Sequence, residues 1–374
     1  MSIRFFTLVD KKMVGVILLL MFIGFVVVLF TTQPDPLDFV LTPTALRQLQ
    51  WYILGWGGFL FFVALDYQKL RGWAPWLYLL ILGLLLGLFF VPAIQNVHRW
   101  YKIPFLGGRE FQPSEYAKII LIIFLSSWLE KHQRQLDRPK IALSTLFLSF
   151  LPLMLILRQP DLGTSLLLYP IILVMLYFAG FKKRILYWMC IVGIGGIVAS
   201  VSIFTGFISH EQMKPLATTF IKEYQYERLN PHTYHQEAAQ NAIALGGMEG
   251  AGWKGGDFAR RSWLPAAHTD SVFPAFAEAF GLIGIFSLLA LFLYLIYLSF
   301  KVSTVAKDPF GCFLAAGIAT YLAVQVIVNI GMMSGCLPIT GVPLILMTYG
   351  GSSVLMSMSA LGILQSIYTR RYLF

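Results

Sequence analysis

Charged residues are scarce in this chain. Only 12% of its 374 residues are Asp, Glu, Lys or Arg, whereas a soluble domain carries roughly 25%. Hydrophobic residues make up 57% of the chain, and the mean hydropathy is +0.72. The scarcity of charge excludes an ordinary soluble domain and indicates an integral membrane protein.

Signatures of several other classes are also missing. The three cysteines are far apart and form no CxxC pair, so they suggest neither a disulfide framework nor a zinc site, and the sequence indicates no other cofactor. The net charge of +10 comes without a basic run or a recognition motif, which argues against a nucleic-acid partner. The apolar runs show no strand alternation, and a bilayer accepts only helices and closed barrels. The predicted fold class is therefore all-α, a polytopic membrane helix bundle.

Ten apolar runs of roughly 17–25 residues, the length that a bilayer core demands, predict about ten transmembrane helices. They cover residues 13–30, 50–66, 75–92, 113–129, 141–157, 164–181, 185–207, 272–300, 309–333 and 342–368. The first run has no small-residue cleavage site, so we expect a retained span rather than a signal peptide. We expect one polytopic domain over residues 1–374.

Basic residues predict the orientation of this bundle. With the N-terminus in the cytoplasm, 16 of the 28 Lys and Arg residues fall in short cytoplasmic segments and five in short segments on the other side. Short cytoplasmic loops are enriched in Lys and Arg, so both termini are predicted to be cytoplasmic. Segment 208–271, between spans seven and eight, is then a large extracytoplasmic loop.

Three regions interrupt the apolar background, all on the predicted outer side. In the first, Glu115 and Lys118 lie three residues apart on one face of a helix that begins near Pro113, where they can pair. The pair either stabilises helix packing or belongs to a polar cavity for a charged head group. Arg99 and Arg109 are nearby cations suited to phosphate, and Arg99 also fits an interfacial anchor.

The second region is the turn between the fifth and sixth predicted spans, residues 158–165. Its Pro and Gly residues account for the turn. Asp161 or Ser165 either caps the next helix or belongs to a binding site. Arg158 is a further cation at the membrane edge.

The third region is the long segment 208–271. His232 and His235 have the i, i+3 spacing of metal ligands, but no clear third and fourth ligands accompany them, so no metal site is predicted. The glycine-dense stretch 246–256 lacks the GK[ST] ending of a P-loop and is interpreted as a flexible or tightly turned lid.

This segment ends in His268, Thr269 and Asp270, where the chain re-enters the bilayer. An ionisable residue at that depth is costly and is a functional-site candidate by default. Asp270 either caps the helix that begins near Val272 or shares a pocket with Glu278, which lies on roughly the same helical face. A carboxylate against a low dielectric has a raised pKa and becomes a usable general base.

Several motifs follow one another along the chain. They are Arg99-Trp100, Phe111-Gln112-Pro113-Ser114-Glu115 with Lys118, Gln159-Pro160-Asp161-Leu162-Gly163-Thr164-Ser165, Gly246-Gly247, Gly250, Gly252-Trp253, Leu264-Pro265 with His268-Thr269-Asp270, Asn329-Ile330-Gly331-Met332, Leu337-Pro338, Gly341-Val342-Pro343-Leu344 and Tyr349-Gly350-Gly351-Ser352. In this order, over essentially the whole chain, they resemble the SEDS family (shape, elongation, division and sporulation), specifically its RodA branch.

The resemblance implies a peptidoglycan glycosyltransferase that polymerises lipid II at the outer face of the cytoplasmic membrane, for cell-wall elongation and cell shape. It also implies a partner, a class B penicillin-binding protein that crosslinks the strands, and contacts with the undecaprenyl-linked glycan and membrane lipids. The family's catalytic aspartate falls on Asp270. The Glu–Lys pair of the family's central cavity falls on Glu115 and Lys118.

The chemistry of this reaction assigns roles to the polar residues. A base must accept the proton of the attacking 4-hydroxyl, which is the role expected of Asp270. Cations must balance the departing undecaprenyl diphosphate. The candidate counter-charges are Arg99, Arg109, Lys118 and Arg158. The other predicted substrate-binding residues are Glu115, Asp161, His268, Thr269 and Glu278.

The surroundings of Asp270 depart from the family pattern. Ala266 and Ala267 stand where an acidic residue is frequent, and Ser271 and Ala279 replace other usual residues. Two alternatives to the polymerase therefore stay open: a flippase for lipid-linked precursors, and a non-catalytic scaffold for the crosslinking enzyme. The polar residues gather on the outer side, which argues against a transporter.

Overall fold

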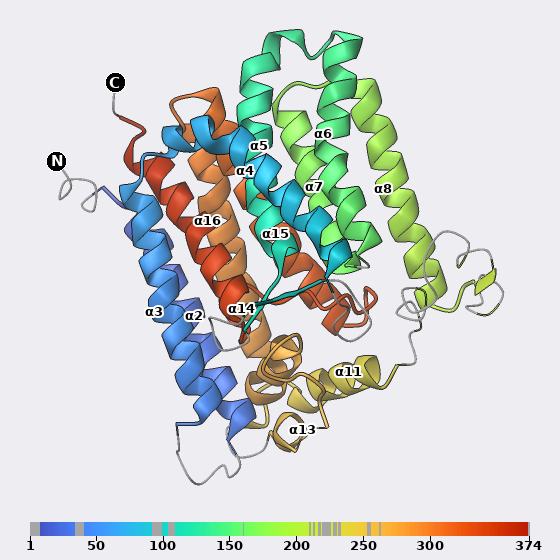
Figure 1. The fold of residues 1–374 in the computed structure, drawn as a ribbon. Coiled ribbons are helices and arrows are strands. Elements are labelled where there is room, and N and C mark those ends of the chain that lie inside the picture. The colour runs from blue at the N-terminus through green and yellow to red at the C-terminus, as the bar shows by residue number, and fades with distance from the viewer. Residues whose placement is uncertain are drawn as a thin grey trace.

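The computed structural model describes residues 8–33, 41–91, 99–103, 109–159, 161–208, 211, 214–215, 218, 226, 230, 233–252, 256–261 and 263–372. Within them, ten helices have 17 or more residues, and each overlaps one predicted apolar run. They are α2 (Lys11–Thr32), α3 (Pro43–Ala64), α4 (Tyr67–Gly87), α5 (Pro113–His132), α6 (Pro139–Arg158), α7 (Leu162–Phe178), α8 (Lys183–Phe204), α14 (Val272–Val305), α15 (Pro309–Met333) and α16 (Gly351–Thr369). The helix bundle in Figure 1 confirms the predicted helical fold class.

Shorter elements complete the described chain. Two helices, α11 (Tyr234–Gly246) and α13 (Asp257–Arg260), lie in the long segment before α14, and 3₁₀ turns cover Leu88–Phe90 and Gln133–Gln135. Strands β1 (Tyr101–Ile103) and β2 (Arg109–Phe111) form a small antiparallel sheet ahead of α5.

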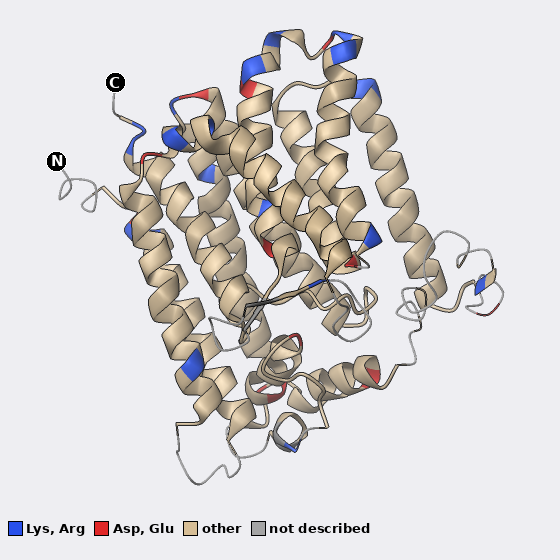
Figure 2. Cartoon of the chain, in the orientation of Figure 1, with Lys and Arg blue, Asp and Glu red and all other residues tan. Residues whose placement is uncertain are grey.

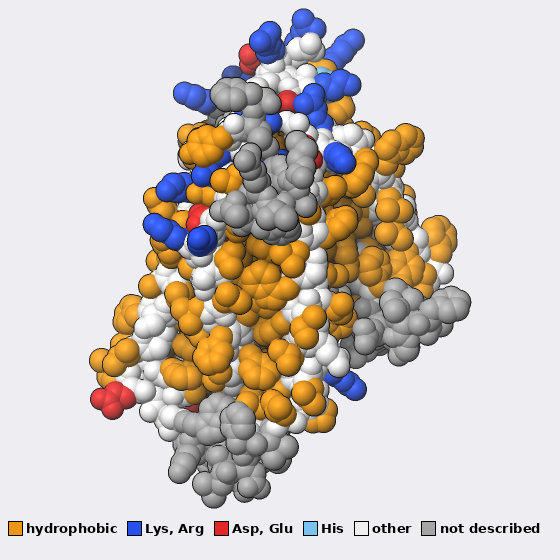
Figure 3. All heavy atoms as spheres, turned by 90° about the vertical axis from the view of Figure 1, so that its left-hand side faces the viewer, with side chains coloured by type: hydrophobic (Ala, Val, Ile, Leu, Met, Phe, Trp, Pro, Cys, Tyr) orange, Lys and Arg blue, Asp and Glu red, His pale blue; other side chains and the backbone are white. Residues whose placement is uncertain are grey.

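The bundle is built around α15, which contacts α4, α5, α7, α11, α14 and α16. Six helices of the described chain are long and apolar enough to cross a membrane, namely α2, α4 (continued by its 3₁₀ turn), α6, α8, α14 and α15. Figure 3 shows hydrophobic side chains spread over a broad face of the bundle, as expected for contact with lipid. The chain is therefore a multi-pass membrane protein.

The two ends of the bundle differ in charge. The main-chain N–H of Asp10 donates to Gln365 Oε1 at 3.0 Å, so the start of α2 and the end of α16 lie together. We call this the terminal end of the bundle, and the opposite end the cavity end. Figure 2 shows that Lys and Arg concentrate at the terminal end, beside both ends of the chain.

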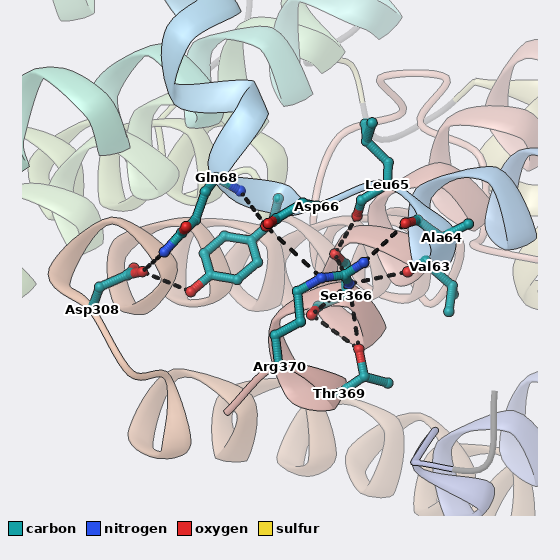
Figure 4. Close-up of polar contacts among 10 residues, drawn as sticks. Val63, Ala64, Leu65, Asp66, Gln68, Asp308, Ser366, Thr369 and Arg370 are labelled. Carbon is teal, nitrogen blue, oxygen red and sulfur yellow. Dashed lines mark hydrogen bonds and ion pairs between the residues drawn. The ribbon is translucent and has the colours of Figure 1, made fainter. Parts of the chain in front are cut away.

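A buried arginine closes the terminal end (Figure 4). Arg370, only 5% exposed, donates to the main-chain oxygens of Val63 at 3.1 Å and Ala64 at 2.9 Å. Ser366 Oγ donates to Leu65 O at 2.6 Å. The last carbonyls of a helix have no partner within the helix, so side chains of α16 satisfy those at the end of α3.

The same end joins two further helices. Asp308 caps α15 by accepting the Gly311 N–H at 2.6 Å, and its other oxygen accepts from Tyr67 Oη at 2.7 Å and Gln68 Nε2 at 2.9 Å. We call the residues drawn in Figure 4, from Val63–Gln68, Asp308, Ser366, Thr369 and Arg370, the terminal-end cluster. It fixes α3, α4, α15 and α16 to one another.

The prediction for the last span is wrong in its first part. The apolar run begins at residue 342, but α16 begins at Gly351, and residues 334–350 contain no regular helix. Gly341 adopts φ +75° and Pro343 has no N–H, which prevents an uninterrupted helix here. Leu344, Ile345 and Met347 are nevertheless completely buried, so this segment folds back into the bundle.

Candidate active site

A cavity of about 550 Å³ lies at the cavity end of the bundle. The first turns of α5, α7 and α16 reach it, together with the turn before α14 and the irregular segment before α16. Its polar lining residues are Arg99, Gln112, Glu115, Asp161, Thr164, Thr269, Asp270, Thr340, Thr348, Tyr349, Ser352 and Ser353. Five residues predicted from the sequence therefore meet here, namely Arg99, Glu115, Asp161, Thr269 and Asp270.

Asp270 lies two residues before the start of α14, at the point where the chain enters the bundle. The N-cap of α14 is Ser271, whose side chain makes no capping hydrogen bond, so Asp270 does not occupy the cap position. The carbonyl of Asp270 accepts from Asn329 Nδ2 on α15 at 3.1 Å. A Cβ built on Gly341 would lie 3.4 Å from Asp270 Oδ2, so the carboxylate faces this glycine across the cavity wall.

The turn that presents Asp270 is tightly wound. The N–H groups of Thr269 and Ser271 both donate to Ala266 O, at 2.9 and 3.1 Å. Ala266 adopts φ +53°, which is uncommon for a residue with a Cβ. Ala266 and the buried Ala267 bring no acidic side chain to this turn, so Asp270 is its only carboxylate.

His268 supports this turn from outside the cavity lining. Its carbonyl accepts from the Tyr349 N–H at 2.9 Å, and the two rings meet edge to face with centroids 5.8 Å apart. Burial lowers the pKa of the His268 imidazole below its ordinary value. A neutral His268 therefore joins the Asp270 turn to the segment before α16.

Glu115 and Lys118 form the predicted ion pair in the first turns of α5. Lys118 Nζ donates to Glu115 Oε1 at 2.8 Å, and Lys118 is completely buried. Its ammonium also lies 5.3 Å from the centroid of the Tyr321 ring. Glu115 Oε2 is buried at the cavity and has no hydrogen-bond partner among the described residues. Lys118 thus lies behind the carboxylate rather than in the cavity lining.

Asp161 combines both interpretations left open by the sequence. It caps α7, accepting from the main-chain N–H of Thr164 at 3.3 Å and from its Oγ1 at 2.9 Å. It also accepts from Ser114 Oγ at 2.8 Å and Gln112 Nε2 at 3.0 Å, which ties the start of α7 to the start of α5. The capped carboxylate borders the cavity.

The three predicted arginines are placed differently. Arg99 borders the cavity and donates to Gln159 O at 3.4 Å. Arg158 is exposed at the end of α6 and is not among the described lining residues. The backbone of Arg109 lies in β2, and its side chain is outside the described part of the structure.

Glu278 does not share a pocket with Asp270. Its two carboxylate oxygens accept the N–H groups of Phe258 and Ala259 in α13, both at 2.9 Å. The sequence placed both acids near one helical face, but the main chain of the preceding loop occupies the face near Glu278. Glu278 therefore fastens that loop to α14.

The described part of the glycine-dense stretch is not a lid. A Cβ on Gly246 or Gly250 would collide with the main chain of α14 at Ala277 or Ala279. Gly281 interrupts α14 at the same place, with φ +63°. These glycines pack the loop against the kinked helix, and the remaining residues, 253–255, lie outside the described part of the chain.

The histidine pair of this loop is not assembled as a metal site in the described structure. His232 lies outside the described residues, and His235 Nε2 is 2.8 Å from Ser271 Oγ. The described residues contain no group of three or more His, Cys, Asp or Glu that could hold a metal ion. His235 instead connects α11 to the residue that follows Asp270.

The irregular segment before α16 is the part of the site to which sequence reasoning assigned no role. Five buried side chains donate to carbonyls of this segment or of the last turn of α15. The pairs are Gln48 to Thr348, Tyr52 to Leu346, Gln236 to Met332, Gln325 to Pro343 and Asn329 to Val342. Irregular backbone in a membrane protein needs such partners. Buried amides in apolar runs are the sequence signal that could have revealed it.

Comparisons with known proteins agree with the motif resemblance. A family model described as "Cell cycle protein" (FTSW_RODA_SPOVE) matches residues 10–373. Peptidoglycan glycosyltransferase MrdB of Escherichia coli (strain K12) is 36% identical over 314 residues, which cover 80% of this chain and 79% of that protein.

Two solved structures share the fold over almost the whole chain. One, "Structural coordination of polymerization and crosslinking by a peptidoglycan synthase complex", matches with a TM-score of 0.75 and 28% identity, over 98% of this chain and 99% of that chain. The Thermus thermophilus rod shape determining protein RodA matches with a TM-score of 0.70 and 27% identity, over 98% of both chains. This chain therefore belongs to the FtsW, RodA and SpoVE family of cell cycle proteins.

Proposed function

We propose that this protein is a peptidoglycan glycosyltransferase that polymerises lipid II into glycan strands, with Asp270 as its general base. The observation that carries the proposal is the cavity of about 550 Å³ in which Asp270 lies with Arg99, Glu115 and Asp161. The Escherichia coli relative is named for this activity. A general base and a cation that line the same cavity are what the reaction requires.

Asp270 is suited to accept a proton from a sugar hydroxyl. In the proposed step, the 4-hydroxyl oxygen of one sugar bonds to C1 of another, its proton passes to Asp270, and the C1–oxygen bond to undecaprenyl diphosphate breaks. A single displacement inverts C1 and needs only one base. Gly341 supports this role because its missing side chain leaves space next to Asp270 Oδ2.

The leaving diphosphate requires positive charge. Arg99 borders the cavity, and α16 begins there at Gly351 with no side-chain capping hydrogen bond. A helix N-terminus offers main-chain N–H groups and the positive end of the helix dipole to an anion. We assign Arg99 and the first turn of α16 to the diphosphate. Arg109 and Arg158 stay predicted counter-charges.

Other polar residues are assigned to the sugar head groups. Glu115 Oε2 is a buried acceptor without a partner in the described structure, and it faces a site that sugar hydroxyls would fill. Asp161 and Thr269 border the same cavity. Lys118 orients the Glu115 carboxylate through its bond to Oε1. We assign His268 and Glu278 to structural support of the site, in place of the predicted contact with substrate.

The proposed arrangement in the membrane follows from charge. We infer ten spans in one polytopic domain, both termini in the cytoplasm, and the large loop 208–271 outside the cytoplasmic membrane. The concentration of Lys and Arg at the terminal end supports this orientation (Figure 2). Lipid II on the outer leaflet could then place its head group in the cavity while its tail stays in the bilayer.

A transpeptidase partner is part of the proposal. One structural neighbour belongs to a peptidoglycan synthase complex that coordinates polymerisation and crosslinking. We infer that this chain works with a class B penicillin-binding protein. Cell-wall elongation and cell shape are the processes it would serve, as expected from the rod shape determining neighbour.

The decisive experiment compares purified wild-type protein with Asp270→Asn, each with the partner transpeptidase and lipid II, and measures glycan strands on gels. Loss of a general base should lower the rate by roughly 10²- to 10⁴-fold. Asp137→Asn is the matched control, because Asp137 is an exposed carboxylate between α5 and α6 and outside the cavity lining. This control should polymerise at the wild-type rate.

Three outcomes would contradict the proposal. Equal polymerisation by wild type and Asp270→Asn would exclude Asp270 as the base. Absence of polymerisation by the wild type, with translocation of labelled lipid II across liposomes, would favour the flippase, and partner binding without either activity would favour the scaffold.

A further inference from the structure

Asn329 on α15 connects two walls of the cavity through a single amide. Its Nδ2 donates to Asp270 O at 3.1 Å and to Val342 O at 2.7 Å. Asp270 and Val342 both line the cavity, whereas Asn329 is completely buried behind them. Both N–H groups of the amide are therefore directed at main-chain oxygens of the two segments that meet at the base.

The oxygen of this amide accepts nothing within the described part of the chain. Asn329 Oδ1 is buried and accepts no hydrogen bond from the described residues. A buried polar atom left in this state costs about 1–3 kcal/mol. Burying the amide oxygen of Asn329 therefore lowers the stability of the fold. The benefit of the asparagine lies in its NH₂ group, which makes both hydrogen bonds.

The two segments need an external restraint. Ala266 at φ +53° and Leu346 at φ +63° are the only non-glycine residues with positive φ in the described chain, and each lies four residues from Asp270 or Val342. Residues in sparsely populated backbone conformations persist only where their surroundings hold them. Asn329 bonds to both segments at once.

We propose that Asn329 is the positioning residue for Asp270, holding the peptide of the base against the turn at Gly341 and Val342 so that its carboxylate faces the cavity. The inference rests on the proposed function, because it assigns a role relative to that base. A base must lie within hydrogen-bond reach of its proton donor, and a displacement of 1 Å can lower a rate by about 10²-fold.

Gln325 provides a matched control one turn earlier on the same helix. Its Nε2 donates to Pro343 O at 3.0 Å, and its Oε1 is also buried without a partner in the described structure. It therefore holds the same irregular segment through the same kind of bond. It differs from Asn329 in one respect: Asn329 also donates to Asp270 O, whereas Gln325 makes no hydrogen bond to Asp270 in the described structure.

The test compares Asn329→Leu with Gln325→Met, since each substitution removes an amide and approximately keeps its volume. Polymerisation is measured with purified lipid II and the partner transpeptidase, and thermal unfolding is followed in detergent. We expect Asn329→Leu to lower kcat by about 10²-fold with KM within threefold of wild type. Gln325→Met should keep kcat within about threefold of the wild-type value. Its unfolding temperature should fall at least as much as that of Asn329→Leu.

A third arm separates this inference from the proposed function. Asp270→Asn is assayed in parallel. If Asp270→Asn is inactive and Asn329→Leu is as active as Gln325→Met, positioning by Asn329 is overturned while the proposed base stands. If Asp270→Asn is active, the proposed function fails first. A loss of kcat in Asn329→Leu explained by an equal loss of folded protein would also overturn the inference.

Discussion

The two ends of the bundle differ in how completely their buried polar atoms are hydrogen-bonded. At the terminal end, Arg370 donates to carbonyls of α3 and to Ser366, and Asp308 accepts on both oxygens. Away from the terminal end, five buried side-chain oxygens accept no hydrogen bond from the described residues. They belong to Gln48, Glu115, Gln236, Gln325 and Asn329, and none of them is in the terminal-end cluster.

The difference separates stability from function. Four of the five oxygens belong to amides whose nitrogen restrains residues 332–348, and the fifth belongs to a carboxylate at the cavity. The buried polar groups of the terminal-end cluster form hydrogen bonds with one another, so this end supports the fold. The cavity end keeps irregular backbone in place. Of the five residues only Glu115 lines the cavity, so its Oε2 is the acceptor that a ligand could reach.

The ion pair behind the cavity should give the largest effect. Lys118→Met would leave the Glu115 carboxylate buried without its partner, and breaking a buried pair costs about 3–5 kcal/mol. We expect a large fall in the thermal unfolding temperature measured in detergent. This result would show that the cavity end also depends on local charge balance.

The double variant Glu115→Gln with Lys118→Met sharpens that result. It removes both charges, so most of the lost stability should return while polymerisation stays low. A double variant as unstable as Lys118→Met alone would show that packing of the lysine, rather than its charge, supports α5.

A substitution at the terminal end should give the next largest effect, and it should change stability without changing activity. Arg370→Met keeps the apolar stem and leaves carbonyls of Val63 and Ala64 without their donor, at a cost of about 1–3 kcal/mol. Thermal unfolding should shift downward, while the polymerisation rate per folded molecule should stay at the wild-type value.

Arg371→Met is the matched control for Arg370. Arg371 stacks on the rings of Tyr368 and Tyr372 at 3.6 and 4.4 Å and is less buried, so its removal should cost at most about 1 kcal/mol. Equal destabilisation by the two variants would contradict the distinct role of the terminal-end cluster.

The smallest effect concerns pH at the cavity end. Burial lowers the pKa of His235 and of His268, so the unfolded chain binds protons more readily than the folded chain. Their stabilisation is complete above the unfolded pKa of about 6.5 and is lost as pH falls toward the lower folded values. Each histidine contributes at most about 1.4 kcal/mol per pH unit.

His235→Gln checks this expectation in unfolding measurements at pH 7.5 and 5.5. The variant should lose less stability on acidification than the wild type, although it loses the contact with Ser271 at both pH values. An identical loss in both proteins would show that His235 is not one of the responsible groups.

Much of the fold was predictable because it depends on hydrophobicity and chain length. Each predicted apolar run contains part of one long helix, and the three polar interruptions lie at helix starts. The start of α16 was missed because residues 342–349 are as apolar as a span, and hydrophobicity alone cannot distinguish a buried irregular segment from a helix.

The site was only partly predictable for a related reason. Asp270, Glu115 and Asp161 were identified as costly carboxylates near helix starts, and the structure brings them to one cavity. Glu278 has the same sequence signal, yet it binds the main chain of α13. Helical spacing predicts which residues share a face, but it does not predict which loop covers that face.

Composition, periodicity and ordered motifs are enough to predict a membrane helix bundle, its family and its few buried charges. Which charges meet could be learned only from the folded chain, since that depends on contacts between residues far apart in the sequence. Asn329 illustrates the division, because its amide reaches Asp270, 59 residues away in the sequence, only in the folded bundle.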